Sequence, residues 1–140
     1  MIYNISYRDR EIIREINTTI GKPFGVIERF KMKGIGSPRF ILNSASNDVA
    51  KRLPPDESMV KVSIELRPKG IIVHINKRAS RLSWVIPYYC LSLFSSEHLG
   101  IHSTGHFLKI KHDDLYNKSV SFIQKVMTCK AHYSDQIRPE

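Results

Sequence analysis

Residues 59–76 read MVKVSIELRPKGIIVHIN, and this stretch decides the fold. Apolar side chains occupy every second position from Val60 to Leu66, and polar side chains fill the positions between them. A period of two is typical of a strand with one buried and one wet face. Residues 67–70, Arg-Pro-Lys-Gly, favour a tight turn because proline presets one backbone angle and glycine tolerates angles that other residues resist. Residues 71–75 then run back, so the stretch predicts a β-hairpin.

Short strands separated by turn residues continue through most of the chain. Pro87 indicates that one long strand is bent or lies at a sheet edge, because proline has no N–H to donate to a neighbouring strand. Thr104 and Gly105 separate two apolar runs and are typical of a tight hairpin. The seven predicted strands cover residues 24–33, 39–42, 59–67, 71–76, 82–94, 99–103 and 106–111. We expect them to form an antiparallel sheet over residues 24–111 that is bent or partly closed into a barrel.

Helical spacing of apolar residues appears near both ends of the chain. Isoleucines recur from Ile12 to Ile20, which predicts a helix over residues 7–20 with Ser6 as its N-terminal cap. The isoleucine stripe needs a partner surface, most simply the sheet. Residues 114–133 show the same spacing and predict an amphipathic C-terminal helix. The predicted fold class is therefore α+β, with an extra helix at the N-terminal end.

Composition is that of an ordinary folded protein. The chain has 140 residues, 41% of them hydrophobic and 25% charged, and we expect one domain over residues 1–140. Cys90 and Cys129 are too few for a disulfide framework. The N-terminus lacks the pattern of a signal peptide, and the longest apolar stretch, 82–94, is shorter than the roughly 20 residues of a membrane span. The sequence predicts a cytoplasmic protein without a transmembrane segment.

The charge balance is strongly basic. Lysine and arginine number 22 against 13 acidic residues, which gives a net charge of +9. Such an excess favours anionic partners, whether nucleic acid, lipid headgroups or acidic proteins. Solubility alone is the alternative explanation.

The order of about seven strands followed by one helix resembles the pleckstrin-homology-like (PH-like) superfold. Residues 83–89, SWVIPYY, are similar to an aromatic residue followed by Ile-Pro-Tyr in some bacterial proteins of that kind, whose function is uncharacterised. The resemblance covers about residues 25–133. It implies two bent antiparallel sheets forming a partly open barrel with a C-terminal helix plugging one end. The helix at 7–20 and the irregular segment 43–58 depart from the family's pattern.

The resemblance also directs attention to basic residues near the first hairpin. In the family, a phosphoinositide site needs several cations that converge on clustered phosphates. The nearest candidates here are Lys69, Lys77, Arg78 and Arg81. They lack the family's Lys-x-Arg core, so no lipid-binding residue is carried over, and fold analogy does not transmit function. These four residues are our predicted anion-binding site.

Three histidines recur every fourth residue. His98, His102 and His106 would stack on one face of a helix in metal-ligating position, but Gly100 and Gly105 argue against a helix there. In a hairpin, His102 and His106 could still approach each other across the strands and hold zinc or nickel. Surface histidines near a turn are the alternative interpretation, and we predict no metal site.

Catalytic signatures are not evident in the sequence. Cys129 and His132 lie three residues apart on the predicted last helix, but a thiolate nucleophile also needs an exposed cleft and a group that orients its base. A cysteine among apolar helix residues is more typical of a core. We therefore predict no catalytic residues and no cofactor, and an enzyme or metal protein that uses His102, His106 and Cys129 is the third hypothesis.

The leading hypothesis is a non-enzymatic binding or scaffolding domain whose basic loops contact an anionic or protein partner. The second hypothesis is a nucleic-acid-binding protein that uses Lys69, Lys77, Arg78 and Arg81 together with nearby aromatic residues. In that case Trp84, Tyr88 and Tyr89 would stack bases while nearby Arg78 and Arg81 contact phosphates.

Overall fold

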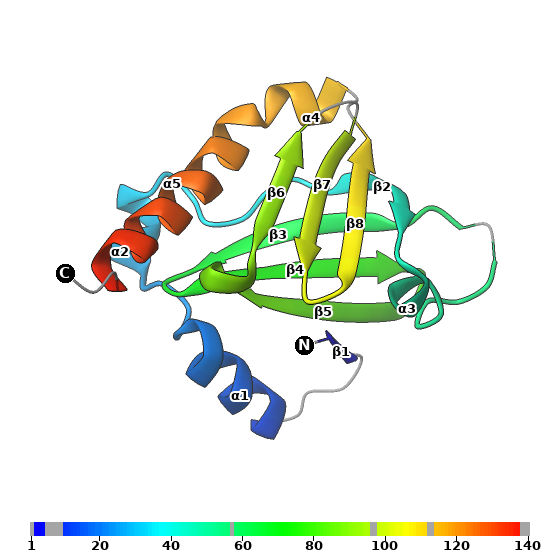
Figure 1. Ribbon diagram of the computed structural model, residues 1–140, viewed down its shortest axis with the longest axis horizontal. Helices are drawn as coiled ribbons and strands as arrows, with labels where there is room; N and C mark the ends of the chain where they lie inside the picture. The colour runs from blue at the N-terminus through cyan, green and yellow to red at the C-terminus, as the bar shows by residue number, and fades with distance from the viewer. Residues whose placement is uncertain (1, 5–9, 57, 96–97, 112–113, 138–140) are drawn as a thin grey trace.

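The computed structural model describes residues 2–4, 10–56, 58–95, 98–111 and 114–137. Within them the fold is α+β, and its centre is an eight-stranded antiparallel open sheet in the order β1-β5-β4-β3-β2-β8-β7-β6 (Figure 1). The strands are β1 (Ile2–Asn4), β2 (Phe40–Ala45), β3 (Lys61–Arg67), β4 (Gly70–Lys77), β5 (Ser80–Pro87), β6 (Ser92–Ser95), β7 (His98–Ser103) and β8 (His106–Lys111). The helices are α1 (Arg10–Ile20), α2 (Val26–Lys31), α3 (Asn47–Ala50), α4 (Asp114–Lys118) and α5 (Val120–Ile137), and a 3-10 turn, η1, spans Tyr88–Cys90.

The hairpin predicted from residues 59–76 is confirmed. Strands β3 and β4 pair from Lys61 opposite Asn76 to Arg67 opposite Gly70. Glycine is required at the end of this turn, because a Cβ on Gly70 would collide with the carbonyl oxygen of Ile86 on β5. The hairpin between β7 and β8 is confirmed as well, with the left-handed backbone of Thr104 and Gly105 forming its turn.

Strand β2 bends the sheet over on itself. Its first residues, Phe40 and Ile41, pair with β3, whereas Leu42, Ser44 and Ala45 pair with β8. The register shifts between Leu42 and Ser44, and an irregularity of this kind bends a strand and increases its twist. As a result, β6 to β8 lie in front of β3 to β5 in Figure 1.

The inward-facing side chains of the two halves share a core. On β3, Val62, Ile64 and Leu66 point inward, as their alternation predicts, and are at most 1% exposed. Trp84 on β5 is the largest fully buried side chain among the described residues. The facing half contributes Leu99, Ile101, Leu108 and Ile110.

Helix α1 covers the outer face of one half. Ile16 and Ile20 pack against Ile72 of β4 and Val85 of β5. The helix predicted over 7–20 is thus confirmed over Arg10–Ile20, and it packs on the sheet as its isoleucine stripe indicates. The predicted capping residue, Ser6, lies outside the described residues.

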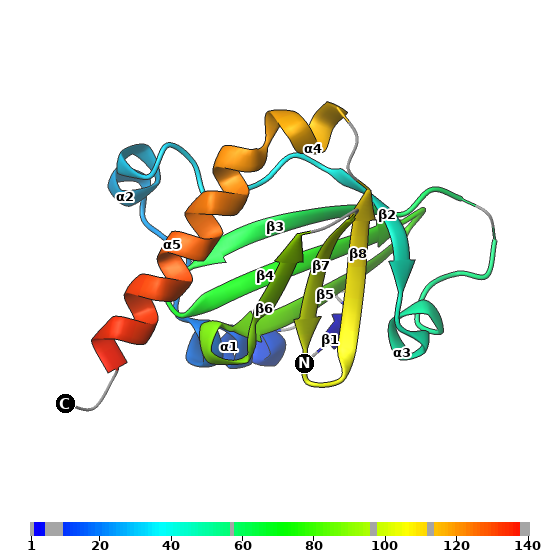
Figure 2. The same cartoon turned by 45° about the horizontal axis from the view of Figure 1, so that its top comes forward.

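The C-terminal helical segment packs against the bent sheet. Phe122, Ile123 and Val126 enter the core, and the Lys130 ammonium donates a hydrogen bond of 2.9 Å to the carbonyl oxygen of Tyr88 in η1. The segment predicted as one helix over 114–133 is divided into α4 and α5 at Ser119. Figure 2 shows α5 running from α4 along the side of the sheet.

Two predicted strands need correction, and one strand was missed. The strand predicted at 24–33 is wrong, because this segment forms helix α2 and has no sheet edge beside it. The strand predicted at 82–94 is divided into β5 and β6 by η1, which begins directly after Pro87. Strand β1 was not predicted, and the described residues therefore contain eight strands instead of seven.

Among the described residues, no helix has both the length and the apolar content needed to cross a bilayer.

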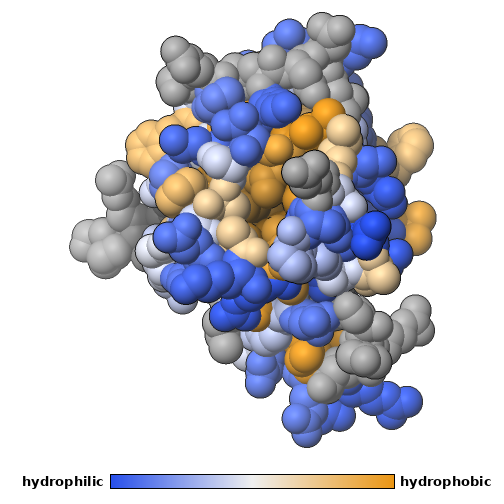
Figure 3. All heavy atoms as spheres, turned by 90° about the vertical axis from the view of Figure 1, so that its right-hand side faces the viewer, coloured by the Kyte–Doolittle hydropathy of each residue, from blue (hydrophilic) through white to orange (hydrophobic). Residues whose placement is uncertain are grey.

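At the end of the molecule that carries α3, apolar surface is visible between hydrophilic side chains (Figure 3).

Candidate functional site

The four basic residues predicted to bind an anion do not form one cluster. Lys69 lies in the turn before β4, whereas Lys77 ends that strand and Arg78 begins the next turn. Arg81 pairs with Asn76 and lies near Lys77 and Arg78. Lys69 is therefore a full strand length away from the other three.

The Lys77 ammonium is already bound by backbone carbonyl oxygens of the same chain. Its ammonium donates hydrogen bonds of 2.6 Å to the carbonyl oxygens of Pro54 and Asp56, and only 8% of the residue is exposed. The Arg78 guanidinium lies 3.3 Å from the Asp56 carboxylate. Hydrogen bonds from Ser58, and to a lesser extent the charges of Arg78 and Lys77, hold the pKa of Asp56 below its usual value. To bind an anion, Lys77 and Arg78 would first have to break these contacts, whereas Arg81 is exposed. Anion binding at this turn stays a prediction.

The hairpin separates the histidines instead of gathering them. His102 pairs with Phe107, and His106 pairs with Ser103. Directly opposite residues share a face and successive residues alternate, so His102 points outward and His106 points inward. His106 instead lies edge to face against Trp84, with its Nδ1 3.7 Å from the Asp48 carboxylate. The register therefore does not favour a His102–His106 metal pair, and the described residues contain no cluster of three or more His, Cys, Asp or Glu side chains that could hold a metal ion.

Cys129 lies against the core near Tyr88. Burial raises the pKa of its thiol, which disfavours the thiolate that a nucleophile needs. Burial, followed by the neighbouring Cys129, also raises the pKa of the Tyr88 hydroxyl, which donates a 3.0 Å hydrogen bond to the carbonyl oxygen of Arg67. This pair is part of the packing between α5 and the sheet.

Two of the three aromatic residues proposed to stack bases are buried. Trp84 is 0% and Tyr88 1% exposed, and only Tyr89 reaches the surface, at 69%. The predicted combination of these three with Arg78 and Arg81 is therefore wrong, because Trp84 and Tyr88 face the core.

A chain of polar contacts crosses the outer face of β3 to β5. The Ser83 hydroxyl lies 3.2 Å from Nδ1 of His74, whose Nε2 lies 3.4 Å from the Glu65 carboxylate. Arg67 donates to Glu65 and also to Asn17 of α1, at 3.0 Å. Burial favours the neutral form of Glu65, but the hydrogen bonds and charges of His74 and Arg67 outweigh it and lower the pKa of this carboxyl to about 2.

Ser83, His74 and Glu65 follow one another in the order of a hydrolase triad. Ser83 is 1% exposed, and its strand is paired on both sides, with Tyr3 of β1 directly opposite. A nucleophilic hydroxyl must reach a substrate, and this one is covered. The chain of contacts therefore links three strands to α1 and serves the structure.

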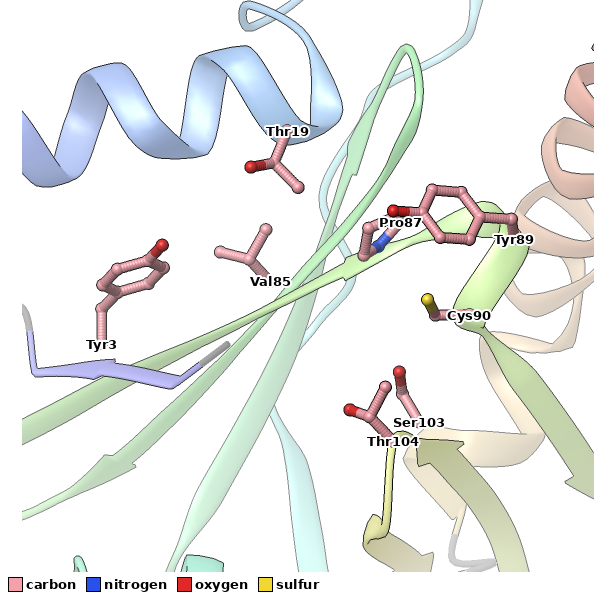
Figure 4. Close-up of a pocket in the computed structure, with 8 residues that line it drawn as sticks. All are labelled: Tyr3, Thr19, Val85, Pro87, Tyr89, Cys90, Ser103 and Thr104. Atoms are coloured by element: carbon pink, nitrogen blue, oxygen red, sulfur yellow. The ribbon is translucent and has the colours of Figure 1, made fainter.

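A small pocket opens between α1, the end of β5 and the β7–β8 turn (Figure 4). It has a volume of about 230 Å³, below the roughly 300–1,000 Å³ of typical ligand sites. The Cys90 thiol and the hydroxyls of Ser103 and Thr104 lie around it with Pro87 and Tyr89. None of its eight lining side chains is charged, so it offers no ionic partner to a charged ligand.

Helix α2 presents apolar side chains to solvent. Val26, Ile27 and Phe30 are 83%, 73% and 85% exposed. The flanking residues Phe24 and Met32 pack against the core and hold the helix at both ends. In Figures 1 and 2, α2 stands away from the sheet, on the side where α5 ends.

Two hydrogen bonds fix the end of α2. The N–H of Lys33 donates to the carbonyl oxygen of Phe30, and that of Gly34 to Arg29, while Lys33 and Gly34 have positive φ angles of 59° and 98°. This pattern is a Schellman motif, which stops a helix. The sequence did contain the signal, because Gly34 follows the apolar residues 26, 27 and 30, which have helical spacing.

Comparison with known proteins gives no further guide. No family model matches the chain, and neither the curated proteins nor the solved structures include a significant match. A functional assignment therefore rests on the residues of this chain.

Proposed function

We propose that the chain is a non-enzymatic binding module that docks through α2 onto an anionic surface. The observation that carries this proposal is the outward exposure of Val26, Ile27 and Phe30 on a helix whose ends are anchored in the core. Exposed apolar groups that lie together mark interaction sites more often than scattered ones do.

The charge around α2 supports an anionic partner. Residues 22–33 contain the basic residues Lys22, Arg29, Lys31 and Lys33 and one acidic residue, Glu28. All five are exposed, and none of the four cations forms an ion pair with a carboxylate of the described structure. Apolar and basic groups therefore act together on one protruding segment.

A lipid surface fits this segment best. The helix is a convex projection, and a headgroup layer can yield around it in a way that a rigid, flat protein surface cannot. Burying a Val, Ile or Phe side chain contributes roughly 1.5–3 kcal/mol, and each basic residue near an anionic membrane about 1 kcal/mol. These gains offset the several kcal/mol that association costs.

The connectivity supports a PH-like organisation for this module. Strands β2 to β5 form one half of the bent sheet, β6 to β8 form the other, β2 pairs in both halves, and a helical segment follows the last strand. Helix α1 and strand β1 are additions to that plan.

Co-sedimentation with lipid vesicles tests the proposal. We expect binding to phosphatidylserine-containing vesicles that weakens with salt, and little binding to neutral phosphatidylcholine vesicles. The triple variant Val26→Ser, Ile27→Ser, Phe30→Ser should lose at least tenfold in affinity, since about 1.4 kcal/mol corresponds to a factor of ten. Ile13→Ser, at a half-exposed position of α1, is the matched control.

Binding that the triple variant retains in full would contradict docking through α2. Polyglutamate provides a second anionic probe. If the wild type binds neither vesicles nor polyglutamate at low ionic strength, the proposed function is wrong. If it binds polyglutamate alone through α2, the partner is an acidic polypeptide and the preference for lipid is wrong.

A further inference from the structure

The outer face of β6 to β8 carries aromatic and basic side chains and no helix. Its outward positions form a surface that we name the stacking face: Ser92, Phe94, His98, Gly100, His102, Phe107, Lys109 and Lys111. In Figure 1 these three strands are nearest the viewer, with none of the described helices in front of them.

The rings of the stacking face contact one another across three strands. Phe94 on β6 lies edge to face against His102 on β7, with ring centroids 5.2 Å apart. His102 in turn stacks on Phe107 of β8, at 5.6 Å and an interplanar angle of 26°. Phe94 is nevertheless 60% exposed, so most of its ring is open to a ligand.

Gly100 has no side chain, which allows the His102 imidazole to lie close to the backbone. The residue lies between Phe94 and Lys109 in the register, and a Cβ there would come within 2.9 Å of Nε2 of His102. The imidazole of His102 therefore lies over the backbone of Gly100.

The charged groups of the stacking face are lysines. The Lys109 ammonium lies 5.8 Å from the centroid of the Phe107 ring, and Lys109 and Lys111 are both exposed. Strands β6, β7 and β8 contain no Asp, Glu, Asn or Gln. A carbohydrate site relies on such hydrogen-bond acceptors, whereas phosphates need only cations and donors.

We propose that the stacking face binds single-stranded nucleic acid. Unpaired bases stack on Phe94 and Phe107, and Lys109 and Lys111 contact the phosphates between them. Aromatic rings on an open sheet beside lysines are a combination that grips unstacked bases with little regard to sequence. A duplex keeps its bases inside, so it can offer the stacking face only its phosphates.

This site is separate from α2. The stacking face lies on β6 to β8, whereas α2 projects from another side of the molecule in both ribbon views. Its rings also lie against one another across the strands instead of protruding individually, as the apolar residues of α2 do. Nucleic-acid binding by the stacking face therefore does not depend on docking through α2.

Fluorescence anisotropy with labelled oligo(dT), oligo(U) and a duplex of equal length tests the proposal. We expect both single strands to bind and the duplex to bind more weakly. Phe94→Ser should reduce single-strand affinity roughly tenfold, as the loss of one stacked base does. Met59→Ser, which removes an apolar side chain of the same 60% exposure outside both the stacking face and α2, should leave it unchanged.

The salt dependence tests the phosphate contacts. Lys109→Gln should reduce the slope of log affinity against log salt by about 0.7, the value for one phosphate contact on a single strand. Lys118→Gln on α4 is the control for loss of a charge elsewhere. Full affinity of both Phe94→Ser and Lys109→Gln, or no binding of either single strand at low salt, would overturn the proposal. The oligo(dT) and oligo(U) arms separate DNA from RNA.

Discussion

The two halves of the bent sheet differ in what lies on their outer faces. On β4 and β5, outward Ile72 and Val85 are buried beneath Ile16 and Ile20 of α1. On β6 to β8, the corresponding positions carry Phe94 and lysines and remain open. Strands β4 and β5 contain the continuous apolar runs 71–73 and 84–86, whereas apolar residues alternate with His98, Gly100 and His102 along β7. The difference shows that the half with aliphatic outward residues is covered by a helix, whereas Phe94, Lys109 and Lys111 on the other half stay exposed.

Removing the contact beneath α1 should have the largest effect on the free energy of unfolding. Ile20 is 0% exposed and packs on the sheet, so Ile20→Ala should lower the free energy of unfolding by about 2–4 kcal/mol through lost burial and a residual cavity. Chemical denaturation measures this directly. The result tests whether the covered half depends on its helix.

Ile27→Ala on α2 is the matched control for that experiment. Ile27 is 73% exposed, so the same truncation should change the free energy of unfolding by less than about 0.5 kcal/mol. Equal losses for the two variants would contradict the distinction between a packed and a presented helix.

The polar network of the covered half should make its stability depend on acid. The folded-state pKa of Glu65, about 2, is depressed below its ordinary value of 4.5, so its stabilising contribution is present above pH 4.5 and is lost as the pH falls toward 2. Glu65→Gln should therefore cost about 1–2 kcal/mol at neutral pH, after allowance for partial exposure of the carboxylate, and little near pH 2. Denaturation of both proteins across this range measures the difference.

Glu28→Gln removes an exposed carboxylate from α2 and controls for the loss of a charge. Its difference from the wild type should stay small and constant across the same pH range. A Glu65→Gln difference that is also constant with pH would show that the carboxylate does not stabilise the fold through its ionised form.

The sequence predicts the fold correctly where the local residue alternation and the available neighbouring strand favour the same structure. Residues 59–76 contain alternation, turn and return strand together, and the hairpin follows from them. In residues 24–33 a period of two is present, but no neighbouring strand is available, and the Schellman motif at Lys33 and Gly34 favours a helix. Strand β1 has three residues and depends on a partner about 80 positions away, so it leaves no local signal.

Site prediction fails where long-range contacts decide exposure. Lys77 looks like a free cation of a basic loop, but the carbonyl oxygens of the distant residues 54 and 56 bury its ammonium. Trp84 has an aromatic side chain in a basic neighbourhood, yet strand parity turns it inward. By contrast, the contact of His102 with Phe107 follows from the hairpin register alone and was accessible from the sequence.

Only a small change in stability is expected from a substitution in the open half. Gly100→Ala places a Cβ against the His102 imidazole, which is the flexible end of a side chain and can move away. The cost should be partly offset because alanine suits a strand better than glycine, so the free energy of unfolding should change by less than about 1 kcal/mol. Displacing His102 breaks its contacts with Phe94 and Phe107, and single-strand affinity should therefore fall severalfold. Gly36→Ala, where a Cβ meets nothing within 4 Å, is the control. Unchanged affinity of Gly100→Ala would show that the row of rings is not the binding element, because this variant alters their arrangement without removing any ring or charge.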